Sequence, residues 1–200
     1  LDERTIEQLP GKDRMIVLAP LRLGDFFRER GYANVHDLDW YDTFTVGEVR
    51  FTALPAVHWS RRTSFDVNRT LWLGFAIRAA ARNIYFGGDS GYGPVFREIG
   101  EAYGPFDTAL VGIGAYAPRA LMQATHTSPE EAIELAADIG AECVVGMHWG
   151  TVVLTEEPQF AAPERLRKAA AARGFTDEQV WVMRIGETRA LPAPAQAGTR

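Results

Sequence analysis

Histidine is rare in this 200-residue chain, and three of its four copies stand at the ends of expected elements. His58 follows a strand-like stretch in ALPAVHWS, His148 ends the run VVGMH, and His126 comes just before the helix-like stretch TSPEEA. Asp89 directly follows the strand-like run IYFGG. Polar residues at such ends can meet at one edge of a sheet, where α/β proteins place their sites. Imidazole and carboxylate groups suit zinc, so these residues are candidates for a metal site.

The stretch IYFGGDSGYG, residues 84–93, sets a single carboxylate among glycines. Glycine lets the backbone come close to a bound group, so Asp89 could bridge two metal ions at the strand end. Each residue also has an ordinary interpretation, because an aspartate among glycines is often a turn former and a histidine after a strand is usually structural. His36, in NVHDLDW, has no accompanying motif, and we expect it to be structural.

The elements that must position these residues alternate along the chain. Hydrophobic runs predict a buried strand over 14–20, a hairpin over 43–56, and further strands over 71–78, 83–86, 106–114 and 142–148. Helices are predicted over 21–31 and 163–174, and terminal strands over 179–191. Alternating strands and helices are typical of an α/β layered domain.

The helix after His126 has the clearest local signals. Ser128 suits the N-cap, Pro129 suits the first helical position, and Glu131 completes a capping box. Apolar residues follow at helical spacing, and Gly140 is expected to end the helix. His126 should therefore lie just before a well-defined helix start.

The composition is that of an ordinary globular protein, with 46% hydrophobic and 24% charged residues. The formal net charge of −5 offers no positive field, so we expect no nucleic-acid partner. Cys143, the single cysteine, fits a reducing compartment and a cytoplasmic location, and we expect it to be a core residue. We predict one domain over residues 1–191 and a disordered tail over 192–200.

Four segments together resemble the metallo-β-lactamase superfamily, and most of all its branch of N-acyl-phosphatidylethanolamine-hydrolysing phospholipases D. They are PAVHWSRRT, YFGGDSGYGPVFREIGEAYGPFDTALVGIGAYAPR, THTSPEEA and GMHWGT. The resemblance runs over about residues 1–154 and implies an α/β fold, the four-layer αβ/βα sandwich, with two zinc ions at one edge. It implies that His58 completes the first zinc site, that His148 completes the second, and that Asp89 bridges both. His126 would bind the scissile group or assist proton transfer.

The family's His-x-His-x-Asp-His motif, which supplies most of the zinc ligands, does not occur in the chain. In relatives this motif directly precedes a Leu-Asp pair, and the chain opens with Leu1 and Asp2. We therefore expect an N-terminally incomplete piece of a longer enzyme rather than a natural half-site. Without its first sheet, the second sheet of the sandwich would expose an apolar face.

The resemblance implies a zinc-dependent hydrolase, and we expect a phosphodiesterase of the phospholipase D type. A metal-bridging hydroxide would attack phosphorus, and iron or manganese would suit similar ligands. The substrate would be a small-molecule or lipid phosphodiester. A lipid substrate would bring peripheral contact with a membrane, for which the apolar side chains of the stretch 21–31 are one candidate, although packing on the core is the commoner role of such residues.

Three arginines are candidate phosphate partners, because a guanidinium binds phosphate at two points. They are Arg61, Arg62 and Arg119, and solvated loop arginines are the ordinary alternative. Tyr116 is a candidate for the substrate-binding wall of the site, together with the tryptophans at 59 and 149.

Two other functions stay open. The same scaffold serves lactonases, since the metal chemistry at a carbonyl is the same. A non-catalytic binding domain that has lost its metals is the second alternative, and the missing ligand motif supports it. The presence of His58, Asp89, His126 and His148 together argues against that alternative, because a binding domain needs none of them.

Overall fold

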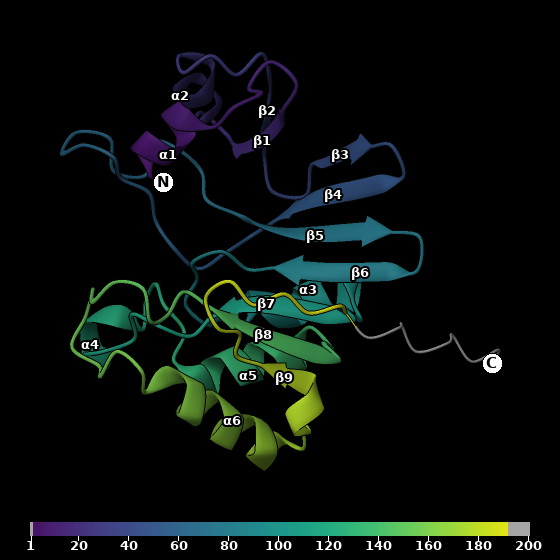
Figure 1. The fold of residues 1–200 in the computed structure, drawn as a ribbon, viewed down its shortest axis with the longest axis vertical. Helices are drawn as coiled ribbons and strands as arrows, with labels where there is room; N and C mark the ends of the chain where they lie inside the picture. The colour runs from purple at the N-terminus through teal and green to yellow at the C-terminus, as the bar shows by residue number, and fades with distance from the viewer. Residues whose placement is uncertain (1, 192–200) are drawn as a thin grey trace.

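The computed structural model describes residues 2–191, and its main feature is one sheet of seven strands (Figure 1). Along the sheet these strands are β3 (Thr43–Val46), β4 (Val49–Leu54), β5 (Gly74–Ala79), β6 (Arg82–Phe86), β7 (Thr108–Gly112), β8 (Cys143–Met147) and β9 (Val180–Trp181). Neighbours from β3 to β6 are antiparallel, and neighbours from β6 to β9 are parallel. The carboxyl ends of β4, β6, β7 and β8 therefore lie at the same edge.

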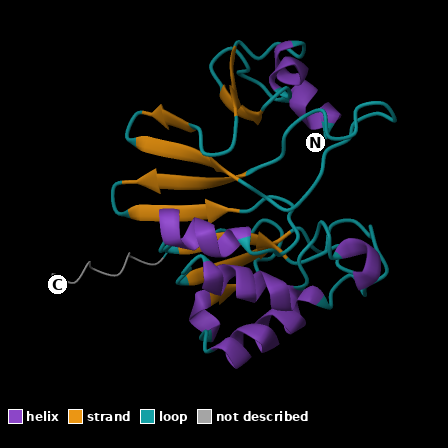
Figure 2. Cartoon of the chain, turned by 180° about the vertical axis from the view of Figure 1, so that it is seen from behind, coloured by secondary structure: helices purple, strands orange, loops and turns teal. Residues whose placement is uncertain are grey.

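Three helices cover one face of the parallel part of the sheet, as Figure 2 shows. They are α3 (Val95–Tyr103), α5 (Pro129–Asp138) and α6 (Ala162–Arg173). Their apolar side chains meet those of the strands in the main core, where Tyr85, Phe96 and Leu166 are 0% exposed. The predicted start of α5 is confirmed, because Ser128 and Glu131 form both hydrogen bonds of a capping box.

The opposite face of the sheet is apolar too, but among residues 2–191 no helix packs on it. Side chains alternate between faces along a strand, so the partners Phe51 and Ile77, and the partners Phe75 and Phe86, share this open face. Phe86 is 38% exposed, and a groove of about 540 Å³ runs between this face and β1. The seven-stranded sheet and the helices on its covered face thus correspond to two of the four expected layers.

A smaller unit of residues 2–38 lies beside the sheet (Figure 1). It holds the parallel strands β1 (Ile16–Pro20) and β2 (Asn34–Leu38) and the helices α1 (Glu3–Gln8) and α2 (Gly24–Arg28). The prediction of a buried strand over 14–20 was wrong in its burial, because only Ala19 is buried in β1. The sheet here has just two strands, so most of β1 keeps contact with solvent.

Several predicted boundaries also differ from the structure. The strand predicted over 71–78 begins at Gly74, the helix predicted over 21–31 covers five residues, and the terminal strands over 179–191 reduce to β9. The turn at 184–187 follows β9, where the amide of Arg184 donates to the Glu187 carboxylate. The short helices α4 (Arg119–Met122) and η1 (Asp177–Gln179) complete the fold. The predicted tail over 192–200 lies outside the described residues, and the division at 191 stays a prediction.

Within residues 2–191, none of the helices combines the length and apolar character that crossing a membrane requires.

Candidate metal centre

The four predicted site residues come together at the sheet edge where β4, β6, β7 and β8 end. His58 follows β4, Asp89 follows β6, His148 follows β8, and His126 lies in the connection after β7. One ligand atom from each of His58, Asp89 and His126 lies within 4.8 Å of the others. The His148 Nε2 is 3.3 Å from the Asp89 Oδ1, and its ring centroid is 5.4 Å from that of His126. This convergence is the arrangement that the strand-end pattern predicted.

Asp89 reaches this edge through the two glycines before it. Gly88 has φ +60°, a left-handed conformation that glycine adopts without strain. A Cβ on Gly87 would lie 3.2 Å from the Leu110 carbonyl oxygen, so the chain passes close to β7 here. The two glycines therefore allow the close approach and the left-handed turn that bring the Asp89 carboxylate to the sheet edge.

Ser90 joins three of the converging segments and was not singled out from the sequence. Its buried hydroxyl accepts a hydrogen bond from the Val57 amide at 2.9 Å, next to His58. Its carbonyl accepts one from the Thr127 amide at 2.8 Å, next to His126. Gly91 also donates to the Val57 carbonyl at 2.7 Å, and a Cβ on Gly91 would meet the backbone of residues 123–125. A small hydroxyl residue after Asp89 was the only sequence signal for this role.

His148 has a left-handed backbone, with φ +58°, which is uncommon for a residue with a side chain. Such strain is found where the surrounding structure holds a residue in place for a function. Gly114 makes room for the turn, since a Cβ there would lie 2.1 Å from the His148 carbonyl oxygen. The turn places the His148 ring against Asp89.

Two of the rings are oriented by hydrogen bonds at Nδ1. The Nδ1 of His58 is 2.7 Å from the Trp59 carbonyl oxygen, and the Nδ1 of His126 is 2.9 Å from the Thr125 hydroxyl. The His58 Nε2 is buried, and within residues 2–191 it has no hydrogen-bond partner. A buried nitrogen without a partner is unusual in folded proteins and suits a metal ligand whose other nitrogen is held by the protein.

The charges of the cluster shift its protonation equilibria. The hydrogen bond from His148 lowers the pKa of Asp89, against the opposing effect of burial. The same hydrogen bond raises the pKa of His148. Burial lowers the pKa of His126, and the positive charges of His148 and His58 lower it further. Asp89 is thus ionised near neutral pH, as a metal ligand must be.

The residues proposed to bind substrate lie in different surroundings. Arg61 and Arg62 are exposed in the connection between β4 and β5, where their guanidinium carbons lie 5.3 Å from the Trp59 ring and 3.9 Å from the Phe26 ring. Arg119 instead binds both carboxylate oxygens of Glu131 and donates to the His126 carbonyl at 2.8 Å. Tyr116 is 2% exposed and belongs to the hydrophobic core.

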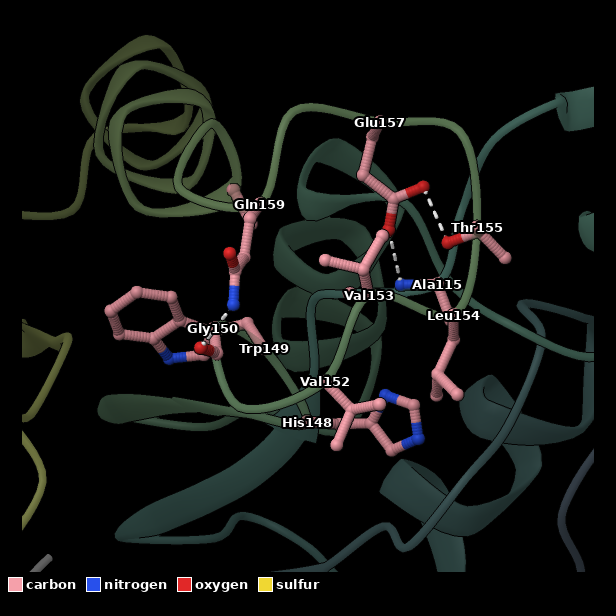
Figure 3. A pocket seen from close by; sticks show the side chains of 12 residues that line it. Ala115, His148, Trp149, Gly150, Val152, Val153, Leu154, Thr155, Glu157 and Gln159 are labelled. Atoms are coloured by element: carbon pink, nitrogen blue, oxygen red, sulfur yellow. Dashed lines mark hydrogen bonds between the residues drawn. The ribbon is translucent and has the colours of Figure 1, made fainter.

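A small cavity of about 30 Å³ lies beside His148, under the loop after β8 (Figure 3). The loop is held by Glu157, whose carboxylate accepts hydrogen bonds from the amides of Ala115 and Ala117 at 2.6 and 3.0 Å. Burial raises the pKa of Glu157, but its hydrogen bonds outweigh that effect and keep the pKa low. Exposed apolar side chains of this loop, Val152 and Leu154, lie near the His148 ring in Figure 3.

The remaining histidine and the cysteine lie apart from this cluster. The His36 Nε2 is 2.7 Å from the Asn34 side-chain oxygen, and its ring packs on Phe44 at 4.1 Å, as expected of a structural residue. Cys143 is buried, and burial raises the pKa of its thiol to about 11, which keeps it protonated.

Comparisons with known proteins show which protein family this chain resembles. The family model described as beta-lactamase superfamily domain matches residues 4–149. The chain is 32% identical over 195 residues to an N-acyl-phosphatidylethanolamine-hydrolyzing phospholipase D, mitochondrial, of Saccharomyces cerevisiae, covering 94% of the chain and 42% of that protein. The chain spans about half the length of the curated relatives it matches.

Solved structures share the fold at low sequence identity. A metallo hydrolase from Ignicoccus hospitalis superposes with TM-score 0.63 and 22% identity, covering 84% of this chain and 65% of that one. CmlA, a diiron beta-hydroxylase from Streptomyces venezuelae, superposes with TM-score 0.62 and 21% identity, covering 80% of this chain and 38% of that one. Both likenesses concern the fold alone.

Proposed function

The chain belongs to the beta-lactamase superfamily, and on that premise we propose that it functions in a metal-dependent hydrolase, a zinc-dependent phosphodiesterase of the phospholipase D type. The observation that carries the proposal is the convergence of three histidines and one aspartate at a single sheet edge. The relative from Saccharomyces cerevisiae, 32% identical, supports the choice of a lipid phosphodiester as substrate.

The residues present fit a metal ion by their chemistry. In a complete site for two ions, His58 would hold the first ion, His148 would hold the second, and Asp89 would supply its carboxylate to both. Bound zinc supplies a water whose pKa is lowered toward about 7, which makes a nucleophile available at neutral pH. The buried and unpartnered Nε2 of His58 and the ionised carboxylate of Asp89 support this assignment. Iron and manganese suit similar ligands, and the same fold occurs in a diiron enzyme.

His126 would handle a proton or bind the scissile group. Its Nδ1 faces the Thr125 hydroxyl, so the Nε2 is the nitrogen left for substrate. Burial lowers its pKa, so the ring is neutral at pH 7 and its Nε2 can take a proton from the attacking water. The imidazolium that results would give this proton to the leaving alkoxide.

Substrate binding would combine cationic and apolar groups around the cluster. Arg61 and Arg62 are the stronger phosphate candidates, because Arg119 is already bound to Glu131. Tyr116 is the weakest candidate for the wall of the site, because it is 2% exposed and packed in the hydrophobic core. Val152 and Leu154 expose apolar surface near His148, which supports an acyl-chain substrate and contact with a membrane surface. The single cysteine is consistent with our assignment to the cytoplasm.

The test uses protein expressed from the complete reading frame. A chromogenic phosphodiester and a lactone are offered as rival substrates, and bound metal is counted by mass spectrometry. We expect turnover of the phosphodiester with about two zinc ions per chain. Asp89→Asn should lower kcat/KM by more than the roughly 10–100-fold that a change outside the ligands costs. His36→Gln is the matched control.

Two results would contradict the proposal. Preferred turnover of the lactone would assign the same metal centre to carbonyl chemistry. A metal-free protein without turnover would favour a binding domain in which Asp89 is only a turn residue.

A further inference from the structure

We propose that Glu157 is a positioning residue that sets the preference of the candidate site for an apolar substrate group. It fastens the loop after β8, whose apolar side chains Val152 and Leu154 then form a wall beside His148 (Figure 3). The inference deepens the proposed function and rests on it for the phosphate chemistry at the metal centre. Glu157 thereby decides how tightly an alkyl or acyl chain attached to the phosphate is bound.

The tip of the loop after β8 is not held by packing on the core of residues 2–191. Val152, Val153 and Leu154 follow one another and are 63%, 69% and 66% exposed. All three nevertheless line the cavity that also borders His148. Segments with few buried apolar contacts are the least stable parts of a fold. The position of this wall therefore depends on polar contacts elsewhere in the loop.

Glu157 supplies such contacts at the far end of the loop. Its Oε1 accepts a hydrogen bond from the Ala115 amide at 2.6 Å, and its Oε2 accepts one from the Ala117 amide at 3.0 Å. The Thr155 hydroxyl donates to the same Oε2 at 2.7 Å, so three donors converge on one carboxylate. Ala115 has φ +59°, which is uncommon for alanine, and a backbone turned in this way can direct nearby amides at an anion. The segment after β7 is thus shaped to receive a carboxylate.

A second set of contacts closes the base of the loop. The Gln159 side chain donates to the Gly150 carbonyl at 2.8 Å. The Trp149 and Phe160 rings meet edge to face, with centroids 6.5 Å apart. These contacts hold the base and leave the tip to Glu157. Loss of the Glu157 hydrogen bonds should therefore free the tip while the base keeps its position.

The test uses protein from the complete reading frame and pairs of ligands that differ only in chain length. Hexyl and methyl p-nitrophenyl phosphodiesters report kcat and KM. Hexylphosphonate and methylphosphonate report affinity without turnover, by calorimetry. In the unmodified protein, the hexyl member of each pair should be preferred by about 10-fold or more, as expected for apolar groups in a pocket.

Glu157→Gln should raise the KM and Kd of the hexyl compounds by about 10-fold and leave kcat and the methyl compounds unchanged. The reason is that a glutamine side chain has one acceptor oxygen and turns a donor toward the second amide. Glu156→Gln is the matched control, because it removes the same charge from the exposed neighbour. Circular dichroism and bound metal are measured for each variant.

A second variant tests the wall itself. Leu154→Ala changes an exposed side chain, so it should leave folding intact, and it should lower the hexyl preference by itself. In the Glu157→Gln protein, Leu154→Ala should have little further effect, because the wall is already displaced. Residues that act through one another show such non-additive effects, whereas independent residues do not.

Five outcomes would overturn the inference. They are equal binding of the hexyl and methyl compounds by the unmodified protein, an unchanged preference in folded Glu157→Gln, an unchanged preference in Leu154→Ala, additive effects of the two changes, and a joint fall of kcat and bound metal in Glu157→Gln. The last would mean that Glu157 supports the metal centre and not the wall. If Glu157→Gln does not fold, Leu154→Ala still decides whether the wall exists.

The two proposals fail separately. If neither phosphodiester is cleaved but Glu157→Gln loses the preference for hexylphosphonate, only the proposed function is wrong. If phosphodiesters are cleaved while the hexyl preference survives in Glu157→Gln, only the role of Glu157 is wrong.

Discussion

The two faces of the seven-stranded sheet carry similar apolar side chains in different surroundings. On the face under α3, α5 and α6, Tyr85 is 0% exposed, whereas Phe86, the next residue of β6, is 38% exposed on the open face. Strand composition therefore does not reveal which face has a partner. The candidate metal centre lies at the sheet edge, and its supports come from the connections after β4, β6, β7 and β8. The supports of the four described site residues therefore lie in these connections rather than on either face of the sheet.

The largest difference in the free energy of unfolding should come from isoleucine-to-alanine changes made on the two faces. Ile133 of α5 is 1% exposed, and Ile133→Ala should lower the free energy of unfolding by about 2–5 kcal/mol. Ile77→Ala on the half-buried open face should cost about 1 kcal/mol or less. Urea unfolding of both variants measures the difference. Equal costs in this chain would show that the open face is covered in solution.

The same two variants also test whether another segment packs on the open face. If protein from the complete reading frame contains a segment that packs there, the cost of Ile77→Ala should rise toward that of Ile133→Ala. The cost of Ile133→Ala should stay the same, because the helices already cover it.

An intermediate effect is expected at the serine that connects the site segments. Ser90→Ala leaves the half-buried Val57 amide without its acceptor, which should cost about 1–3 kcal/mol in unfolding free energy. Zinc affinity should fall as well, because the segments of His58 and His126 lose their common anchor. The matched control is Ser60→Ala, which removes a hydroxyl that donates to the Thr70 carbonyl within the connection between β4 and β5. A stability loss without a change in zinc affinity would mean that Ser90 supports the fold and not the site.

The smallest effect should come from the ion pair between α5 and α6 on the covered side. Arg165 binds both carboxylate oxygens of Glu130 at 2.9 and 2.8 Å. Burial raises the pKa of Glu130, but the hydrogen bond and charge of Arg165, together with hydrogen bonds to the backbone and to Ser128, outweigh burial and lower the net pKa. The stability from this pair is therefore present above the ordinary glutamate pKa and is lost as pH falls through the lowered value.

Glu130→Gln should reduce stability by about 1 kcal/mol or less at pH 7, because the pair is half exposed. The difference from the unmodified chain should shrink toward pH 3 in thermal unfolding scans. A difference that stays constant with pH would show that the pair contributes through packing and not through charge.

The sequence predicted the four site residues because each stands at the end of a hydrophobic run or beside a helix start, and the parallel arrangement brings such ends together. It could not identify Ser90 or Glu157, which act through backbone amides of distant segments. β2 was missed because NVHDL has no clear alternation, and His36 was the only residue in it that drew attention. The open apolar face was expected from the resemblance. The low burial of β1 could not be predicted from its sequence, because it results from β1 pairing with only one strand, β2.

The left-handed backbone of His148 has a consequence for reading any alanine scan of this protein. Alanine or a β-branched residue at that position would add a conformational penalty to the loss of the imidazole, so the measured deficit would overstate the chemistry. Asparagine tolerates the same backbone and lacks the ring, which makes it the fairer replacement. Part of the loss measured for alanine at position 148 would therefore be the cost of holding a residue with a Cβ in the left-handed conformation.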